Sequence, residues 1–314
     1  MIVLVFVGHS FDVPVIENPW KWLIYGFHMP IFMVLSGYLI NVDTLRRLPL
    51  RDFFEKYAVR LLAPWLIAIV VYTAIFVDVN SPKDFFAAIL YPYYHLWYVP
   101  VLFVYVVWVY INRFSPVLQF LSLASVSVLA MAIFGQGNWS GFEFSDFGTA
   151  VVRALGDKRL YTMAIFFGFG VFLRKYGAQF LANRSAVTLT VVASVAAVIY
   201  QALFYSVSPV ILILTFIVLN LALSSVYPHM FSLRPIKVPI LYLIGIDSLY
   251  FYLWHPLIFM TARKLIYPMV PIPVAMTGTT LAAIGILFAV RSATRRLHVL
   301  DAALGLQPRM PAPA

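Results

Sequence analysis

The chain has 314 residues, of which 63% are hydrophobic and only 11% are charged, and its mean hydropathy is +0.91. Soluble domains are about half apolar and about a quarter charged, so this composition excludes a soluble globular protein and indicates a polytopic membrane protein. The net charge of +10 fits the cytoplasmic loops of such a protein better than a nucleic-acid interface. Without cysteine, the chain has no disulfides and no thiolate nucleophile or metal ligand.

The chain begins with an apolar arm, Met1 to Phe11, that is too short to span a membrane. As a helix it reaches about 17 Å, roughly half of the hydrocarbon core, so we expect an incomplete first helix and a start that is placed too late. A signal peptide is the other interpretation, although the basic and small-residue features of one are missing. Polar residues and two prolines at 12–19 should turn the chain into the next helix, forming a hairpin.

We expect an all-α transmembrane bundle of about ten helices, the first incomplete. A span needs about 20 apolar residues to cross roughly 30 Å. The further predicted spans are Trp20–Ile40, Val59–Val77, Leu96–Ile111, Pro116–Phe134, Leu160–Leu173, Ala186–Tyr205, Pro209–Tyr227, Ile240–Phe259 and Pro271–Val290. Residues 1–300 then form one transmembrane domain and residues 301–314 a short tail with a Pro-rich end. The longest connecting segment, Gly135–Arg159, is expected to cover a site on the outer face.

The distribution of basic residues predicts the orientation. If the first arm runs outward, about two thirds of the 22 Lys and Arg residues fall in inner loops. This positive-inside pattern puts the C-terminus in the cytoplasm. It also places four histidines in the outer half of the bundle: His9, His28, His95 and His255.

These histidines are candidates for chemistry because ionisable side chains within a membrane are costly to bury. His9 is the first candidate, since an imidazole titrates near neutrality and can take a proton from a hydroxyl. The alternative is a capping or interfacial histidine beside Asp12. His28 lies near Pro30, which frees a backbone carbonyl, so this histidine either takes part in the chemistry or satisfies that carbonyl.

The remaining candidates also have two interpretations. His95 and Trp97 lie in an aromatic run that is typical of a membrane interface. Asp247, an acid inside a predicted span, either extends toward the cytoplasmic face or pairs with Arg60 or Lys237. Alternatively, it lines a polar path with His255, which lies on nearly the same helix face.

Arg60 ends a run of five cations, Arg46, Arg47, Arg51, Lys56 and Arg60. The run binds the phosphates of a nucleotide-bearing donor, binds anionic lipid headgroups, or only marks the cytoplasmic side. The sequence has no Walker loop, no dinucleotide-binding glycine pattern and no HExxH helix. We therefore expect no metal and no nucleic-acid partner.

Five short segments, in order, resemble the acyltransferase 3 family of membrane enzymes, and within it the branch of fucose 4-O-acetylase and other polysaccharide acetyltransferases. The segments are LVFVGHS (Leu4–Ser10), FHMPIFMVLSGY (Phe27–Tyr38), RLLAPW (Arg60–Trp65), HLWYVPVLF (His95–Phe103) and DSLYFYLWHP (Asp247–Pro256). Each segment alone is a weak indication of the family. Five segments in the same order over nearly the whole chain make the resemblance specific.

The resemblance implies an O-acyltransferase that moves an acyl group, usually acetyl from acetyl-CoA, to a sugar hydroxyl of a cell-envelope or exported polysaccharide or its lipid-linked precursor. Its expected place is the bilayer of a bacterial inner membrane. The family's catalytic histidine matches His9, and His28 is a second catalytic candidate. Arg60 and Lys56 are the candidates for binding the CoA phosphates. The other candidate site residues are Ser36, Tyr38, His95, Trp97, Asp247 and His255.

The chain departs from the family pattern at two places. The Arg or Lys expected eleven positions before His9 would precede Met1, and Tyr57 stands where a basic residue is often found, with Lys56 as its substitute. Two other functions stay open. One is a transporter or flippase of envelope glycans, although the inverted repeats of many transporters are not evident. The other is a truncated, inactive family member.

Overall fold

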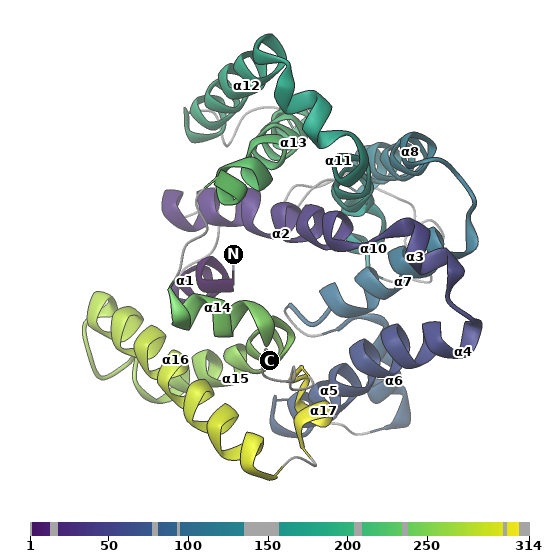
Figure 1. Cartoon of the computed structure of the whole chain (residues 1–314). Coiled ribbons are helices and arrows are strands. Elements are labelled where there is room, and N and C mark those ends of the chain that lie inside the picture. Colours follow the sequence, from purple (N-terminus) through teal and green to yellow (C-terminus); the bar gives the residue numbers. More distant parts are fainter. Residues whose placement is uncertain are drawn as a thin grey trace. The chain divides into compact units, whose positions relative to one another are not determined.

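The computed structural model of the chain describes residues 2–12, 18–76, 81–92, 95–134, 157–203, 209–233, 238–297 and 300–307. These residues form helices and no strand, which confirms the predicted all-α fold (Figure 1). The chain divides into two compact units, and each is assembled from segments far apart in the sequence. The first unit comprises Met1–Pro14, Pro49–Phe103 and Lys237–Ala314, and the second comprises Val15–Leu48 and Val104–Ile236.

The first unit contains the two ends of the chain and one central segment. Its helices are α1 (Ile2–Ser10), α4 (Leu50–Phe53), the π-helix η2 (Phe54–Leu62), α5 (Ala63–Phe76), α6 (Pro82–Leu90), the start of α7 (Tyr98–Ile111), α14 (Pro239–Ile246), α15 (Ser248–Leu265), α16 (Ile272–Leu297) and α17 (Asp301–Leu304). The short helix α1 packs against both α15 and α16, which lie side by side (Figure 1).

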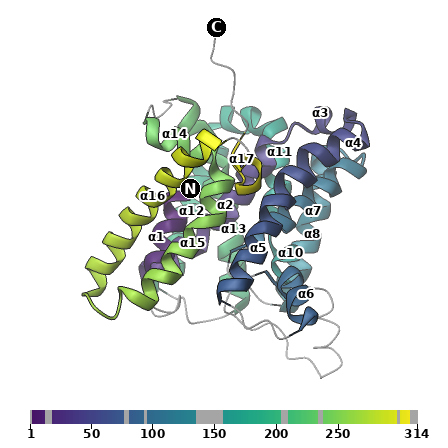
Figure 2. The same cartoon turned by 90° about the horizontal axis from the view of Figure 1, so that it is seen from below.

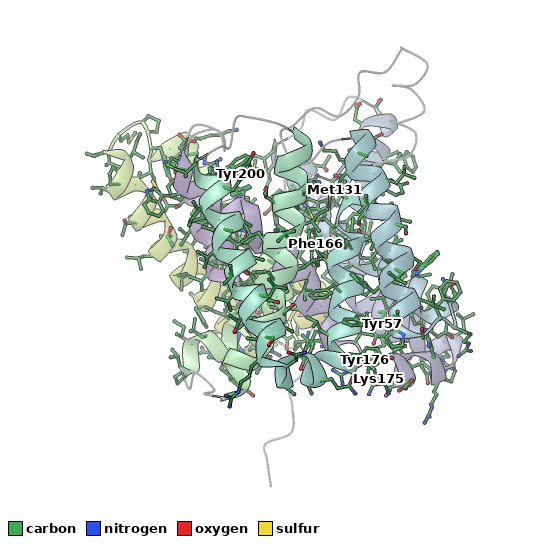
Figure 3. The ribbon with its side chains drawn as sticks, turned by 90° about the horizontal axis from the view of Figure 1, so that it is seen from above. Tyr57, Met131, Phe166, Lys175, Tyr176 and Tyr200 are labelled. Atoms are coloured by element: carbon green, nitrogen blue, oxygen red, sulfur yellow. The ribbon has the colours of Figure 1, made fainter. Side chains whose placement is uncertain are left out.

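The second unit is built around α11. Its helices are α2 (Pro19–Leu39), α3 (Val42–Arg47), the rest of α7, α8 (Pro116–Phe134), α10 (Arg159–Thr162), α11 (Ala164–Ala182), α12 (Arg184–Leu203) and α13 (Pro209–Leu233). Helix α11 contacts α2, α8 and α13. Met131 of α8 and Phe166 of α11 are fully buried, whereas Lys175 is exposed toward the C-terminal end of α11 (Figure 3).

Within the described residues, three helical stretches are long and apolar enough to cross a membrane: Pro19–Leu39, Leu50–Phe76 and Ile272–Arg296. The pair α14 and α15 is a fourth if it is counted as one broken span. Shorter apolar helices lie at Tyr98–Ile111, Pro116–Ala132, Arg184–Tyr200 and Leu214–Val226. The count of about ten spans therefore stays a prediction. The outer loop expected at Gly135–Arg159 falls mostly on residues 135–156, which lie outside the described part of the chain, as do residues 308–314 of the Pro-rich tail.

Two predicted spans differ in form from the expectation. The continuous helix predicted over Ile240–Phe259 is wrong, because the backbone bends by 93° between α14 and α15 at Asp247 (Figure 2). The carboxylate of Asp247 at this bend pairs with two arginines of α16, as described below. The span predicted from Val59 begins earlier, at Leu50, and winds as a π-helix just before Pro64, whose missing N–H prevents regular α-helical bonding there.

Helices α2 and α11 approach each other closely at two glycines. A Cβ atom on Gly37 would overlap the carbonyl oxygen of Phe167, and one on Gly170 would overlap the carbonyl oxygen of Val34. Small residues allow such backbone contact between membrane helices. Gly37 lies between the candidates Ser36 and Tyr38, so this part of the second family-like segment serves helix packing.

We expect Gly170→Ala to destabilise the second unit, because its methyl group meets rigid backbone of α2 and overpacking costs about 1–3 kcal/mol. Gly177→Ala on the same helix is the matched control, since its Cβ would meet only the Leu173 side chain, at 3.8 Å. Thermal unfolding of the detergent-solubilised chain measures the difference. Equal melting temperatures for the two variants would contradict this packing.

Candidate active site

Three histidines from distant segments meet in the first unit. His9 lies near the end of α1, His95 in the turn before α7, and His255 in the middle of α15. The ring centroid of His9 is 5.8 Å from that of His95 and 5.2 Å from that of His255, and the last two are 5.0 Å apart. His95 and His255 are buried, while His9 is half-buried. The structure therefore joins three residues that the sequence marked separately, and the most accessible is His9.

The end of α1 that carries His9 is held by α15 and the turn after it. A helix end leaves its last carbonyls without intrahelical partners. Arg263 Nη2 donates to the carbonyls of His9 and Phe11, both at 2.7 Å, and Tyr267 Oη donates to that of Ser10 at 2.6 Å. Arg263 Nε also pairs with Asp12 Oδ1 at 3.3 Å. These contacts fix the backbone of His9 against α15.

His95 is fixed by a gap that Pro256 leaves in α15. Proline has no N–H, so the carbonyl four residues earlier, that of Tyr252, lacks its helical donor. His95 Nε2 donates to this carbonyl at 2.7 Å, and the Tyr252 hydroxyl donates back to the His95 carbonyl. The exchange locks the His95 ring to α15.

Two of the three imidazoles have a defined tautomer when neutral. A carbonyl only accepts, so the proton of His95 is on Nε2, which donates to Tyr252. His255 Nδ1 donates to the carbonyl of Phe251 at 2.9 Å, so its proton is on Nδ1. The second ring nitrogens, Nδ1 of His95 and Nε2 of His255, are then acceptors.

Aromatic rings shield the cluster. Phe6 of α1 stacks on His255 with a centroid distance of 4.6 Å and an interplanar angle of 22°, and Phe259 lies 6.1 Å from His255. Both phenylalanines are fully buried. Their rings lower the local dielectric and strengthen the electrostatic interactions of the imidazoles. In the described part of the chain, no three His, Cys, Asp or Glu side chains are placed to hold a metal ion.

Asp247 has a different environment from the one expected. Its side chain is fully buried at the bend between α14 and α15, and it pairs with Arg291 Nε at 2.6 Å and Arg295 Nη2 at 2.9 Å. The predicted pairing with Arg60 is therefore wrong, and Lys237 lies outside the described residues. Arg291 and Arg295 are four residues apart on one face of α16, which is why both reach the same carboxylate.

The chain after α16 closes this ionic cluster. The backbone N–H of Gln307 donates to Asp247 Oδ1 at 2.9 Å, and Arg295 Nη1 donates to the Gln307 carbonyl at 2.6 Å. Arg295 also pairs with Asp301 at 3.2 Å, and Trp254 Nε1 of α15 donates to the carbonyl of Leu304 at 3.0 Å. Residues 301–307 of the predicted tail are thus bound to the first unit.

The cations of the five-residue run do not share one set of partners. Arg46 in the second unit donates to the carbonyls of Val109 at 3.3 Å and Phe114 at 2.7 Å, and Arg51 pairs with Glu55 at 3.0 Å. Lys56 and Arg60 are exposed, four residues apart on the π-helix η2, a form of helix that often marks functional sites. These two cations are the members of the run best placed to meet an anionic ligand.

The candidates in the second unit have local partners. His28 Nδ1 donates to the carbonyl of Ile24 at 2.7 Å. The carbonyl that Pro30 frees is that of Gly26, and Asn220 Nδ2 of α13 donates to it at 2.8 Å, so His28 does not fill this structural role. His28 stays a predicted catalytic residue.

Ser36, Tyr38 and Trp97 make structural contacts. The Ser36 hydroxyl donates to the carbonyl of Phe32 at 2.9 Å, and Arg174 Nη1 donates to that of Tyr38 at 3.0 Å. Trp97, in the first unit, is buried two residues after His95.

Sequence analysis missed Tyr72, Tyr252, Arg263 and Asn220. Pro30 was a usable signal for Asn220, because it marks the carbonyl four residues earlier, that of Gly26, which needs another donor. Pro256 marks the carbonyl of Tyr252 in the same way.

The described residues thus form an apolar, all-helical chain with a cluster of three histidines in its first unit. A family model described as an acyltransferase domain (Acyl_transf_3) matches residues 1–291, most of the chain. The chain belongs to this acyltransferase 3 family and is an integral membrane acyltransferase. No curated protein and no solved structure matches the sequence.

Asp247→Asn should destabilise the first unit strongly, because it leaves two largely buried arginines without their shared carboxylate, and breaking a buried ion pair costs about 3–5 kcal/mol. Glu55→Gln is the control, since it breaks the exposed pair with Arg51 and should cost less than about 1 kcal/mol. The melting temperatures of the purified variants measure both effects. A small effect at Asp247 would contradict its role at the bend.

Proposed function

We propose that the protein is an O-acyltransferase that transfers an acetyl group from acetyl-CoA to a sugar hydroxyl of a cell-envelope or exported polysaccharide, or of its lipid-linked precursor. The family supports the reaction class. The observation that carries the site assignment is the cluster of His9, His95 and His255, in which His9 is the most accessible ring. We place this reaction in a bacterial inner membrane with the C-terminus in the cytoplasm, as the loop charges predict.

In this proposal His9 is the general base. Its ring nitrogen takes the proton of the acceptor hydroxyl while the hydroxyl oxygen attacks the thioester carbonyl of acetyl-CoA. The tetrahedral intermediate collapses with cleavage of the carbon–sulfur bond. The CoA thiolate leaves and takes the proton from His9, so the histidine returns to its starting state and the products are the acetyl ester and free CoA.

The neighbouring imidazoles support this role of His9 electrostatically. Two unit charges about 5 Å apart at an effective dielectric of about 20 repel by roughly 3 kcal/mol. In this proposal the cluster therefore carries one added proton at a time, the one that His9 takes from the hydroxyl and returns to the leaving thiolate.

Arg60 and Lys56 are the proposed ligands for the CoA phosphates. Both are exposed on η2, and the loop charges put this helix near the cytoplasmic face, where CoA is found. Arginine binds phosphate through paired N–H groups, and lysine adds a point charge. Since both residues belong to the same unit as His9, one donor molecule is proposed to extend from η2 toward the histidine cluster.

His9→Ala should reduce acetyl transfer by at least about 100-fold, because a general base contributes roughly 10²–10⁴ in rate. The control variant is His229→Ala, which removes a histidine of α13 that is not a candidate site residue. The chain and the two variants are expressed at matched membrane levels in cells whose surface glycans lack acetyl esters. The measured quantity is acetate released by mild base from the extracted glycans. We expect acetate with the unaltered chain and the control, and almost none with His9→Ala.

Other results separate the alternatives. Equal acetylation with and without His9 would contradict the assignment of the base. A change in the amount of exported glycan without any change in acetylation would favour the transporter. No acetylation by the unaltered chain at a normal membrane level would favour the inactive family member.

A further inference from the structure

Three consecutive carbonyls of α15 each accept a hydrogen bond from a side chain. The pairs are Phe251 O with His255 Nδ1 at 2.9 Å, Tyr252 O with His95 Nε2 at 2.7 Å, and Leu253 O with the Tyr72 hydroxyl at 2.9 Å. In an uninterrupted helix each of these carbonyls is bonded by the N–H four residues later. The first two donors belong to the histidine cluster, and the third comes from α5.

The Tyr72 hydroxyl bridges two groups of α15. It donates to the Leu253 carbonyl and accepts from the Leu257 N–H at 3.0 Å. Leu253 and Leu257 are four residues apart, so these are the carbonyl and the N–H that a regular helix would join directly. Tyr72 is completely buried, and its ring meets the ring of His95 edge-on at a centroid distance of 6.4 Å. The hydroxyl therefore acts as a wedge in α15, by which we mean that it lies between the Leu253 carbonyl and the Leu257 N–H and bonds to both.

This wedge lies beside the gap that Pro256 creates. Pro256 cannot donate to the Tyr252 carbonyl, and His95 donates to it instead. Tyr72 donates to the next carbonyl along the helix, that of Leu253. His255 directly precedes the proline. His95, which donates to the first of these carbonyls, also lies 5.0 Å from His255 between ring centroids, so the interruption of α15 is directly linked to the histidine cluster.

We infer that Tyr72 is a positioning residue of the acyl-transfer site, which holds α15 open at Pro256 so that His255 and His95 meet His9 in a productive arrangement. The inference rests on the proposed role of His9. Tyr72 itself acts only through α15 and His95. If the hydroxyl is removed, Leu253 and Leu257 can bond directly, the helix closes at this point, and the ring of His255 shifts with it.

A shift of this kind should lower kcat and leave substrate binding unchanged. Misplacement of a catalytic group by about 1 Å costs up to roughly 100-fold in rate. We expect Tyr72→Phe to reduce kcat at least about tenfold, with an unchanged KM for acetyl-CoA, because the proposed CoA ligands Arg60 and Lys56 lie on η2.

The test uses the full chain in lipid nanodiscs, with two readouts. The first is the rate at which diethyl pyrocarbonate modifies His9, followed by mass spectrometry of the His9 peptide, which needs no turnover. The second is CoA release from acetyl-CoA in the presence of a glycan-containing membrane extract from the cells in which the chain is expressed. Tyr250→Phe is the matched control: this buried tyrosine lies on α15 itself and, like Tyr72, donates to a carbonyl, that of Leu287, at 2.9 Å.

Pro256→Ala gives a second, independent variant. It restores an N–H for the Tyr252 carbonyl, competes with His95, and should straighten α15 without lowering the melting temperature. We expect both Tyr72→Phe and Pro256→Ala to change the rate of His9 modification at least threefold and to lower kcat, while Tyr250→Phe changes neither. A purely structural role would make activity and melting temperature fall together.

Unchanged His9 modification and unchanged kcat in Tyr72→Phe would overturn the inference, and so would a fully active Pro256→Ala variant. If Tyr72→Phe does not fold, Pro256→Ala decides alone. The modification rate also separates this inference from the proposed function. A chain that releases no CoA but whose His9 reactivity depends on Tyr72 would contradict the acyltransferase proposal and leave the positioning role supported.

Discussion

Inside a membrane, a carbonyl that a proline deprives of its helical donor must find another donor within the protein, because water is not available there. Pro30 in α2 and Pro256 in α15 impose that demand. The Gly26 carbonyl, which Pro30 leaves without a donor, accepts from Asn220 of α13. The Tyr252 carbonyl, which Pro256 leaves without a donor, accepts from His95. In the second unit the result is a packed helix pair. In the first unit the same physical requirement brings an imidazole to the centre of the site.

The first unit depends on this arrangement because α15 contacts α1, α5, α14 and α16. It binds the end of α1 through Arg263, His95 through the Tyr252 carbonyl, and α5 through the Tyr72 hydroxyl. Its N-terminal end starts at Asp247, whose charge is neutralised by two arginines of α16. These contacts fix α15 at its start, middle and end, which suits the proposed role of the histidine cluster, whose members must be held in place.

The sequence predicted the all-α membrane fold, because apolar length is a local signal. It also marked the individual candidates, because ionisable residues in apolar segments are a local signal, and their roles stay predictions. It did not predict that His9, His95 and His255 meet, since their approach is decided by the packing of three distant segments. The bend at Asp247 was also missed, because the apolar run is continuous and the arginines that pair with Asp247 lie 44 and 48 residues further along the chain. Pro256 was visible in the sequence, but the donors that fill its gap were not.

The central claim is that the histidine cluster of the first unit is where the acyl group is transferred. The most direct measurement is a cryo-electron microscopy structure of the full chain in nanodiscs with an unreactive ketone analogue of acetyl-CoA. The account predicts the phosphates at Arg60 and Lys56 and the ketone carbon within roughly 3.5 Å of the reactive position beside a His9 ring nitrogen. An analogue bound with its acyl end away from His9, His95 and His255 would contradict it.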